Sequence, residues 1–179
     1  MGFSRFRRSL PRLTMIEQAL VQARRQIRAG HYARAGIILA ALAREAEALE
    51  RPKIAAELHC RAAHCFVDGG AEPSGLSEAR AALRVFRNLG LMERYARFLT
   101  NILRKLQAHG MLSGVGMLRT EFDGVDVPQL VQATPVRNLR LPEACSQCGA
   151  PLRSDEVEWI DAHSIECNYC GAVVQGKEN

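Results

Sequence analysis

From about residue 11 to residue 109, the apolar residues recur at the spacing of helices. In the first helical segment they stand three and four positions apart, at Ile16, Leu20, Ala23 and Ile27. This spacing places them on one face of a helix. Thr14 and Glu17 fit a capping box at the start of that helix, and Gly30 ends it.

Four further segments repeat this helical pattern between turn signals. The second helix is expected to stop at Pro52. Two breaks, Asp68-Gly69-Gly70 and Pro73-Ser74-Gly75, predict a long loop before a fourth helix that Ser77 caps. The five expected helices cover about residues 14–29, 32–49, 53–67, 77–89 and 91–108. Helices of similar length in succession predict stacked antiparallel hairpins.

The turn between the first two helices has an ordered series of residue sizes. In Ala29-Gly30-His31-Tyr32-Ala33-Arg34-Ala35, a glycine, a polar residue, an aromatic residue and a small residue allow two helices to approach closely. With Pro52 closing the hairpin, residues 13–109 resemble tetratricopeptide-type repeats. The resemblance implies a concave face that binds a peptide or a helix. A plain helical bundle is the alternative, because the second helix overruns the repeat length of about 34 residues.

Residues 111–142 have a different character. They hold three glycines, three prolines and no sustained period, which predicts a linker of about 30 residues. The expected domains are therefore a basic arm over 1–12, a helical-repeat domain over 13–110, this linker, and a cysteine-rich unit over 143–179.

The cysteine-rich unit contains two Cys-x-x-Cys pairs, each followed by a glycine, and 18 residues separate the two pairs. Their cysteines are Cys145, Cys148, Cys167 and Cys170. Two residues between cysteines make a tight turn with both sulfurs on one side, and four thiolates complete a tetrahedral shell suited to Zn²⁺. Such a shell has no open position for a substrate or an activated water. The sequence therefore predicts one structural zinc ion.

The spacer between the two cysteine pairs is predicted to form strands. Residues 156–160 alternate like a half-buried strand, residues 161–164 form a turn, and Ile165 begins a return strand. Residues 172–174 can form a third. His163, in the turn, is expected to be exposed rather than a ligand.

The unit resembles a zinc ribbon or a rubredoxin-like knuckle over residues 143–176. Rubredoxins hold iron with the same paired knuckles, so iron is the alternative metal. Their aromatic-rich cores are poorly matched here, where Trp159 and Tyr169 stand nearly alone. The expected fold class is mainly α, with antiparallel, tetratricopeptide-like hairpins followed by a small β zinc ribbon.

A second group of metal-ligating residue types lies on the third expected helix. Cys60 and His64 are four positions apart, which can place two ligands on one face, and His59 and Cys65 stand beside them. No further pair of ligands is evident for this group. We therefore interpret the cysteines as small buried side chains and the histidines as residues of a helix surface or interface.

Composition and charge narrow the functional classes. Apolar residues make up 47% of the chain and aromatics 6%, so the core is expected to consist of Ala, Leu, Ile and Val. No segment reaches the roughly 18 apolar residues of a membrane span, and no secretory signal follows the N-terminal arginines. A cytoplasmic location with reduced thiols is therefore expected.

The two ends of the chain carry opposite charge. Residues 1–34 hold eight arginines and one glutamate, a net charge of +7. Residues 143–179 hold two basic and seven acidic residues, a net charge of −5. A nucleic acid would therefore be bound through the N-terminal arginines Arg5, Arg7, Arg8 and Arg12 rather than through the acidic cysteine-rich unit.

No catalytic motif is present: the sequence has no glycine-rich phosphate loop, GxSxG or HExxH. The function we expect is a non-catalytic protein–protein interaction adaptor with a structural zinc ribbon. The first alternative is a nucleic-acid-associated factor. The second is a docking module resembling part of a RING-type ubiquitin-ligase domain, although nothing follows Cys170 to build the second zinc site of a RING.

Overall fold

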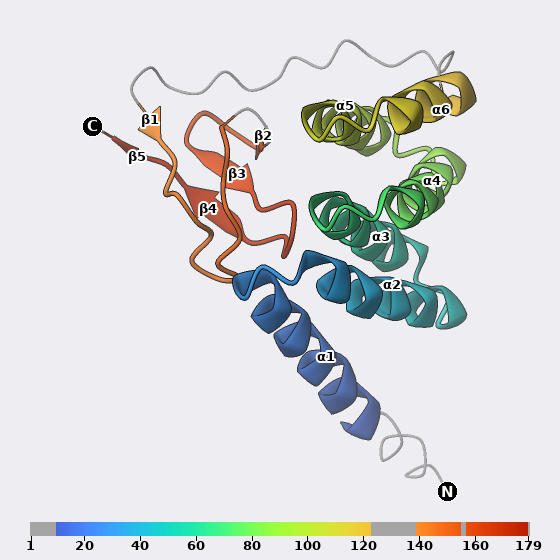
Figure 1. The fold of residues 1–179 in the computed structure, drawn as a ribbon. Coiled ribbons are helices and arrows are strands. Elements are labelled where there is room, and N and C mark those ends of the chain that lie inside the picture. The colour runs from blue at the N-terminus through green and yellow to red at the C-terminus, as the bar shows by residue number, and fades with distance from the viewer. Residues whose placement is uncertain (1–9, 123–138, 155–156, 179) are drawn as a thin grey trace, which may run out of the picture.

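The computed structural model describes residues 10–122, 139–154 and 157–178. These residues form a stack of helices with a small β unit beside it (Figure 1). The helices are α1 (Leu10–Arg28), α2 (Tyr32–Ala48), α3 (Pro52–Asp68), α4 (Glu72–Asn88), α5 (Met92–Ala108) and α6 (Leu112–Phe122). The predicted mainly helical fold class is confirmed. None of the described helices is long and apolar enough to cross a membrane.

The prediction of a long loop between the third and fourth helices is wrong. Only residues 69–71 separate α3 from α4, and Pro73 lies in the first turn of α4. A proline there loses no helical hydrogen bond, because the first amides of a helix have no partner within it. Gly75 lies inside the helix, where a Cβ would come within 3.0 Å of Val67 in α3. The residues interpreted as helix breakers thus allow a helix start and a close helix contact.

Two further boundaries differ from the sequence prediction. The first helix begins at Leu10, so Thr14 lies within it and does not cap its start. The first part of the predicted linker is helical, because α6 occupies residues 112–122 and buries Val115, Leu118 and Phe122. The helices therefore extend beyond the predicted domain end at residue 110, and the described residues contain six of them rather than five.

The turns between successive helices repeat one geometry. The residue with positive φ recurs every 20 positions, at Gly30, Glu50, Gly70, Gly90 and Gly110. In each turn the next residue donates its backbone N–H to the carbonyl five positions earlier, as His31 does to Gln26 at 2.9 Å. This is the Schellman type of helix end. A hairpin of two such helices spans 40 residues, longer than the tetratricopeptide length of about 34.

The β unit contains two small antiparallel sheets. The strands are β1 (Leu139–Arg140), β2 (Glu158–Trp159), β3 (Ser164–Glu166), β4 (Val173–Gln175) and β5 (Lys177–Glu178). Strands β2, β3 and β4 form one sheet in that order, at the three places the sequence predicts. The pairing of β1 with β5 was not predicted, because β1 falls within the expected linker.

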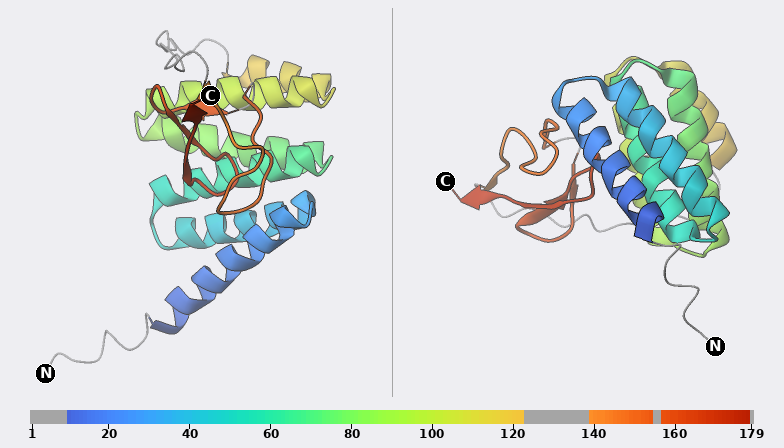
Figure 2. Two further views of the ribbon diagram at one scale, coloured as in Figure 1. Left: turned by 90° about the vertical axis from the view of Figure 1, so that its left-hand side faces the viewer. Right: turned by 90° about the horizontal axis from the view of Figure 1, so that it is seen from below.

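Buried apolar side chains form two clusters, and the β unit belongs to the first. That cluster joins Ala23 and Ile27 of α1 and residues of α2 and α3 to Ile165, Tyr169 and Val174. The second cluster lies among α3, α4, α5 and α6 and includes Leu83, Ile102 and Leu118. Both further views show the β unit against one side of the helical stack (Figure 2). From here on, the name cysteine-rich unit covers the whole β unit as the structure describes it, residues 139–154 and 157–178.

Candidate metal centre

Four sulfur atoms of the cysteine-rich unit converge on one point. The Sγ atoms of Cys145, Cys148, Cys167 and Cys170 all lie within 4.8 Å of one another. Cys145 and Cys170 are 3.7 Å apart at Sγ, and Cys148 and Cys167 are also 3.7 Å apart. A tetrahedral ion with metal–sulfur bonds of about 2.3 Å requires sulfur–sulfur edges of about 3.8 Å. These separations exceed a disulfide bond of about 2.05 Å. The predicted ligand set therefore has the spacing of a four-thiolate metal site.

The two knuckles have the same backbone hydrogen bonds. Gly149 donates its N–H to the carbonyl of Cys145 at 2.7 Å, and Gly171 donates to Cys167 at 2.8 Å. Both glycines adopt positive φ, +72° and +69°. The left-handed conformation favours glycine, because other residues bring their Cβ close to the following carbonyl. The glycine that follows each Cys-x-x-Cys pair is thus required by the turn that aims the two sulfurs together.

The thiols interact strongly with one another. Hydrogen bonds to Cys148 and Cys170, with burial, raise the pKa of Cys167, whereas bonds from Cys148 and Cys167 lower the pKa of Cys170. One thiolate is thus stabilised by the neighbouring S–H groups, and further ionisation is opposed. A divalent cation would replace these protons and allow all four sulfurs to be thiolates. The residues present fit such an ion, and Zn²⁺ matches the donor set.

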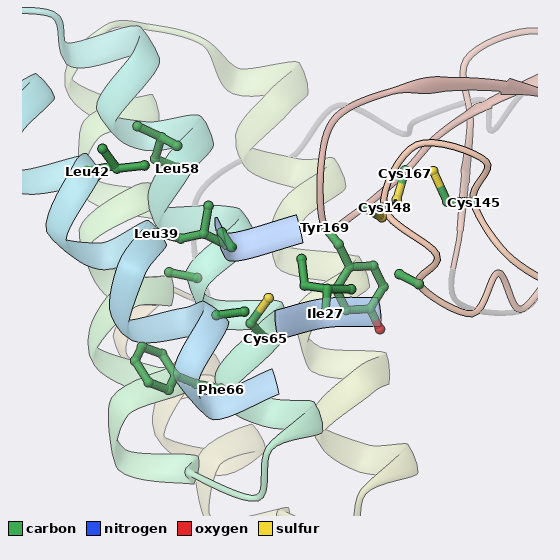
Figure 3. Close-up of a cluster of buried hydrophobic side chains, with 14 of the residues drawn as sticks. Ile27, Leu39, Leu42, Leu58, Cys65, Phe66, Cys145, Cys148, Cys167 and Tyr169 are labelled. Atoms are coloured by element: carbon green, nitrogen blue, oxygen red, sulfur yellow. Dashed lines mark hydrogen bonds between the residues drawn. The ribbon is translucent and has the colours of Figure 1, made fainter. Parts of the chain in front are cut away.

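Tyr169 connects the second knuckle to the helices. Its side chain lies beside Ile27 on the side of the knuckles that faces the helical stack (Figure 3). Its hydroxyl donates to Asp68 Oδ2 at 2.5 Å and accepts from Lys105 Nζ at 2.9 Å. Lys105 also pairs with Asp68 Oδ1 at 2.9 Å, although its side chain is only 2% exposed. A buried ion pair between α3 and α5 is thus completed by a residue between two of the candidate ligands.

Arginines from two helices contact the two knuckles. Arg28 at the end of α1 donates to the backbone carbonyl of Gln147 at 2.6 Å, and its Cγ lies 2.6 Å from where a Cβ of Gly149 would be. Arg61 of α3 approaches the second knuckle, with Nη2 1.9 Å from the corresponding point at Gly171. Both Cys-x-x-Cys turns therefore pack closely on helical side chains.

A cavity of about 270 Å³ lies between the cysteine-rich unit and α3, α4 and α5. Phe86 and Phe98 are its buried apolar lining, and the more exposed lining includes Arg94 and Arg97. The cysteine-rich unit contributes Cys167, and Ile160 and Asn168 as well. Sequence analysis could not find this cavity, because its walls come from segments about 100 positions apart.

The second group of candidate ligands does not form a metal site. Among the residues that the structure describes, the four cysteines are the one group arranged to hold an ion. Cys60 and His64 line the cavity, Cys65 is buried, and His64 Nδ1 has no hydrogen-bond partner. His59 bonds instead to two glutamates of neighbouring helices, so its imidazole lies at a helix interface.

The sequence also made predictions for His163 and for the N-terminal arginines. His163 is exposed in the turn before β3, where Asp161 Oδ1 accepts its backbone N–H at 2.7 Å. The N-terminal arginines Arg5, Arg7 and Arg8 lie outside the described residues. Arg12 lies in α1, but its side chain is also outside them.

No family model matches this chain, and neither the curated proteins nor the solved structures compared with it give a match.

Proposed function

We propose that the protein is a non-catalytic adaptor that binds another protein and carries one structural zinc ion. The observation that carries this proposal is the complete set of four candidate ligands. Four cysteines supply all the donors of a tetrahedral site, and both knuckles are packed against helices. A site of this kind stabilises structure and leaves no coordination position for a substrate.

We propose zinc rather than iron because the residues around the sulfur atoms differ from those of a rubredoxin. The partners of the site are a tyrosine hydroxyl, an ion pair and two arginines, rather than an aromatic-rich core of the rubredoxin type. Elemental analysis of the purified protein tests the choice. One equivalent of zinc and a colourless solution are expected, and a red, iron-containing protein would contradict it.

The partner site we propose is the cavity between the cysteine-rich unit and α3, α4 and α5. Its aromatic lining suits one apolar side chain of a partner segment. The charged lining is mixed, with Glu57 and Glu166 beside the arginines, and Arg94 and Arg97 pair with Glu57 and Glu93, so the apolar side chain carries the recognition. Because the cysteine-rich unit lies on the helices, both parts of the chain contribute to this one site.

The test is affinity purification of the tagged chain from its native host, with and without nuclease. A stoichiometric protein is expected to remain after nuclease treatment. Ile160→Arg and Arg97→Glu, at the exposed side of the cavity, should each lose that protein. Ile37→Arg is the matched control, because Ile37 is an exposed residue of α2 that does not line the cavity. Equal loss in all three variants would contradict the cavity as the partner site.

A nucleic-acid-associated factor is the second candidate function. The net charge of +7 over residues 1–34 favours it, since clustered arginines bind phosphates with release of counterions. Binding would then disappear with nuclease and weaken steeply with salt. A RING-type docking module would need a second zinc site, and the described part of the chain holds one group of ligands.

A further inference from the structure

We propose that the helical stack is part of the metal site's support. Asp68, Lys105 and Arg61 act as positioning residues that slow the loss of metal from the four cysteines. In return, the bound metal holds the cysteine-rich unit against α1, α3 and α5. The inference rests on the metal site and is independent of the proposed partner.

The position of Tyr169 ties the ion pair to the metal-binding turn. The residue lies between Cys167 and Cys170, so its backbone follows the conformation that places these two sulfurs. Its hydroxyl bonds to both members of the pair, and its ring lies 5.9 Å from that of Tyr32 and 5.0 Å from Lys105 Nζ. A turn that loses its metal and changes shape would withdraw this hydroxyl from Asp68 and Lys105.

The arginine contacts add a second attachment. Arg61 lies against the backbone of the second knuckle so closely that a Cβ at Gly171 would overlap its guanidinium. Arg28 donates to the first knuckle at Gln147. Each Cys-x-x-Cys turn therefore has its own helical contact. Both contacts require the knuckle backbone in the conformation that the metal stabilises.

Docking of the cysteine-rich unit on the helices and binding of metal to its cysteines are thermodynamically linked. If the helices bind the metal-loaded form of the cysteine-rich unit more tightly than the metal-free form, docking must raise the affinity for metal by the same factor. A unit of about 40 residues has too small a core to keep its fold without such support or a metal. The helices then contribute to metal retention without supplying a ligand.

The first test measures zinc transfer from the full-length protein to a chromogenic chelator. Tyr169→Phe and Arg61→Ala should each speed the transfer about threefold to tenfold, and Lys105→Met should do the same or more. Tyr95→Phe is the control for the first variant, because it also loses a buried hydroxyl bond, to the carbonyl of Phe122 in the second cluster. Arg84→Ala, on α4, is the control for Arg61→Ala.

Far-UV circular dichroism of each variant checks that the helices remain. Should Lys105→Met fail to fold, Tyr169→Phe and Arg61→Ala decide the matter. Transfer rates equal to those of the two controls would overturn the proposal.

The second test follows hydrogen exchange of the full-length protein when zinc is removed with a chelator. Faster exchange is expected in the C-terminal parts of α3 and α5, around Asp68 and Lys105, as well as in the cysteine-rich unit. Unchanged exchange at those helix ends would show that docking does not depend on the metal, and would overturn the reciprocal part of the proposal.

Discussion

At the scale of single residues, the position with positive φ in each turn between helices follows a rule with one exception. The residue with positive φ is a glycine in four of the five turns between described helices, and Glu50 in the fifth. A residue with a Cβ costs about 1–2 kcal/mol in the left-handed conformation, whereas glycine adopts it freely. No side chain or backbone lies within 4 Å of a Cβ built at Gly30, Gly70, Gly90 or Gly110. Conformation, and not close helix approach, therefore selects glycine there.

Glu50→Gly should stabilise the protein. Relief of the left-handed strain outweighs the greater backbone entropy of an unfolded glycine, so a net gain of about 0.5–1 kcal/mol is expected. Thermal unfolding should show a rise in melting temperature of about 2–5 °C. Gly90→Ala, the reverse change in an equivalent turn, should lower it by a similar amount. A fall in both variants would show that the Glu50 side chain stabilises its turn.

Cys148→Ser should release the metal and disorder the cysteine-rich unit while most helical signal remains. Cys148 is fully buried within the sulfur cluster, and a serine hydroxyl is a poor replacement for a thiolate ligand. Metal content and far-UV circular dichroism check this result. Cys60→Ser, outside the cluster, should keep its metal. Stoichiometric zinc in Cys148→Ser would refute the ligand assignment.

At the scale of elements, His59 joins three helices through one imidazole. Its Nδ1 lies 2.5 Å from Glu78 Oε2 of α4, and its Nε2 lies 3.2 Å from Glu47 Oε1 of α2. Burial lowers the pKa of His59, but the bonds to Glu78 and Glu47 raise it more, so the pKa is raised overall above 6.5. The charged form is therefore stabilised where α2, α3 and α4 meet.

The stabilisation by His59 should depend on pH. A pKa raised on folding gives a contribution that is complete below the unfolded value of about 6.5 and is lost as pH rises through the folded pKa. The difference in melting temperature between the protein and His59→Gln should thus shrink as pH rises above about 6.5 and through the raised folded pKa. A difference that stays constant with pH would contradict the role of the charged imidazole.

At the scale of the whole molecule, the two apolar clusters divide the helical stack unequally. The first cluster includes the cysteine-rich unit, whereas the second consists of residues from α3 to α6 alone. Buried side chains of α1, such as Ala23 and Ile27, belong to the first cluster. The N-terminal helices therefore depend on the C-terminal part of the chain for their burial.

Removal of residues 123–179 should destabilise the two halves of the stack differently. Exposure of the first cluster should lower the melting temperature by about 5 °C or more and speed hydrogen exchange in α1, α2 and α3. The α4–α6 half should keep most of its protection, because its cluster remains complete. Mass spectrometry of exchanged peptides checks this. Equal loss of protection in all helices would indicate one cooperative unit instead.

The sequence by itself determined the local features of this protein. Helical periodicity places buried residues such as Ile27 on one face, and the two Cys-x-x-Cys-Gly segments identify the four cysteines whose sulfurs converge. Strand alternation locates β2, β3 and β4. These features depend on interactions between residues close in the chain, or on a spacing that only one geometry satisfies. Pro73 and Gly75, interpreted as breakers, have different reasons for their places in α4. Pro73 lies in the first turn, where it loses no helical hydrogen bond, whereas Gly75 allows a close contact with Val67 of α3 that the local pattern does not reveal.

Only the tertiary structure decided how the two parts meet. Lys105 in α5 and Tyr169 in the second knuckle are 64 positions apart, and nothing in their local pattern links them. Their contact depends on the shape of a surface that α1, α3 and α5 form together. It also depends on the burial of the Lys105–Asp68 ion pair beside the Tyr169 hydroxyl. The docking of the metal-binding turns and the cavity beside them are properties of that surface, because no single segment of the chain contains either.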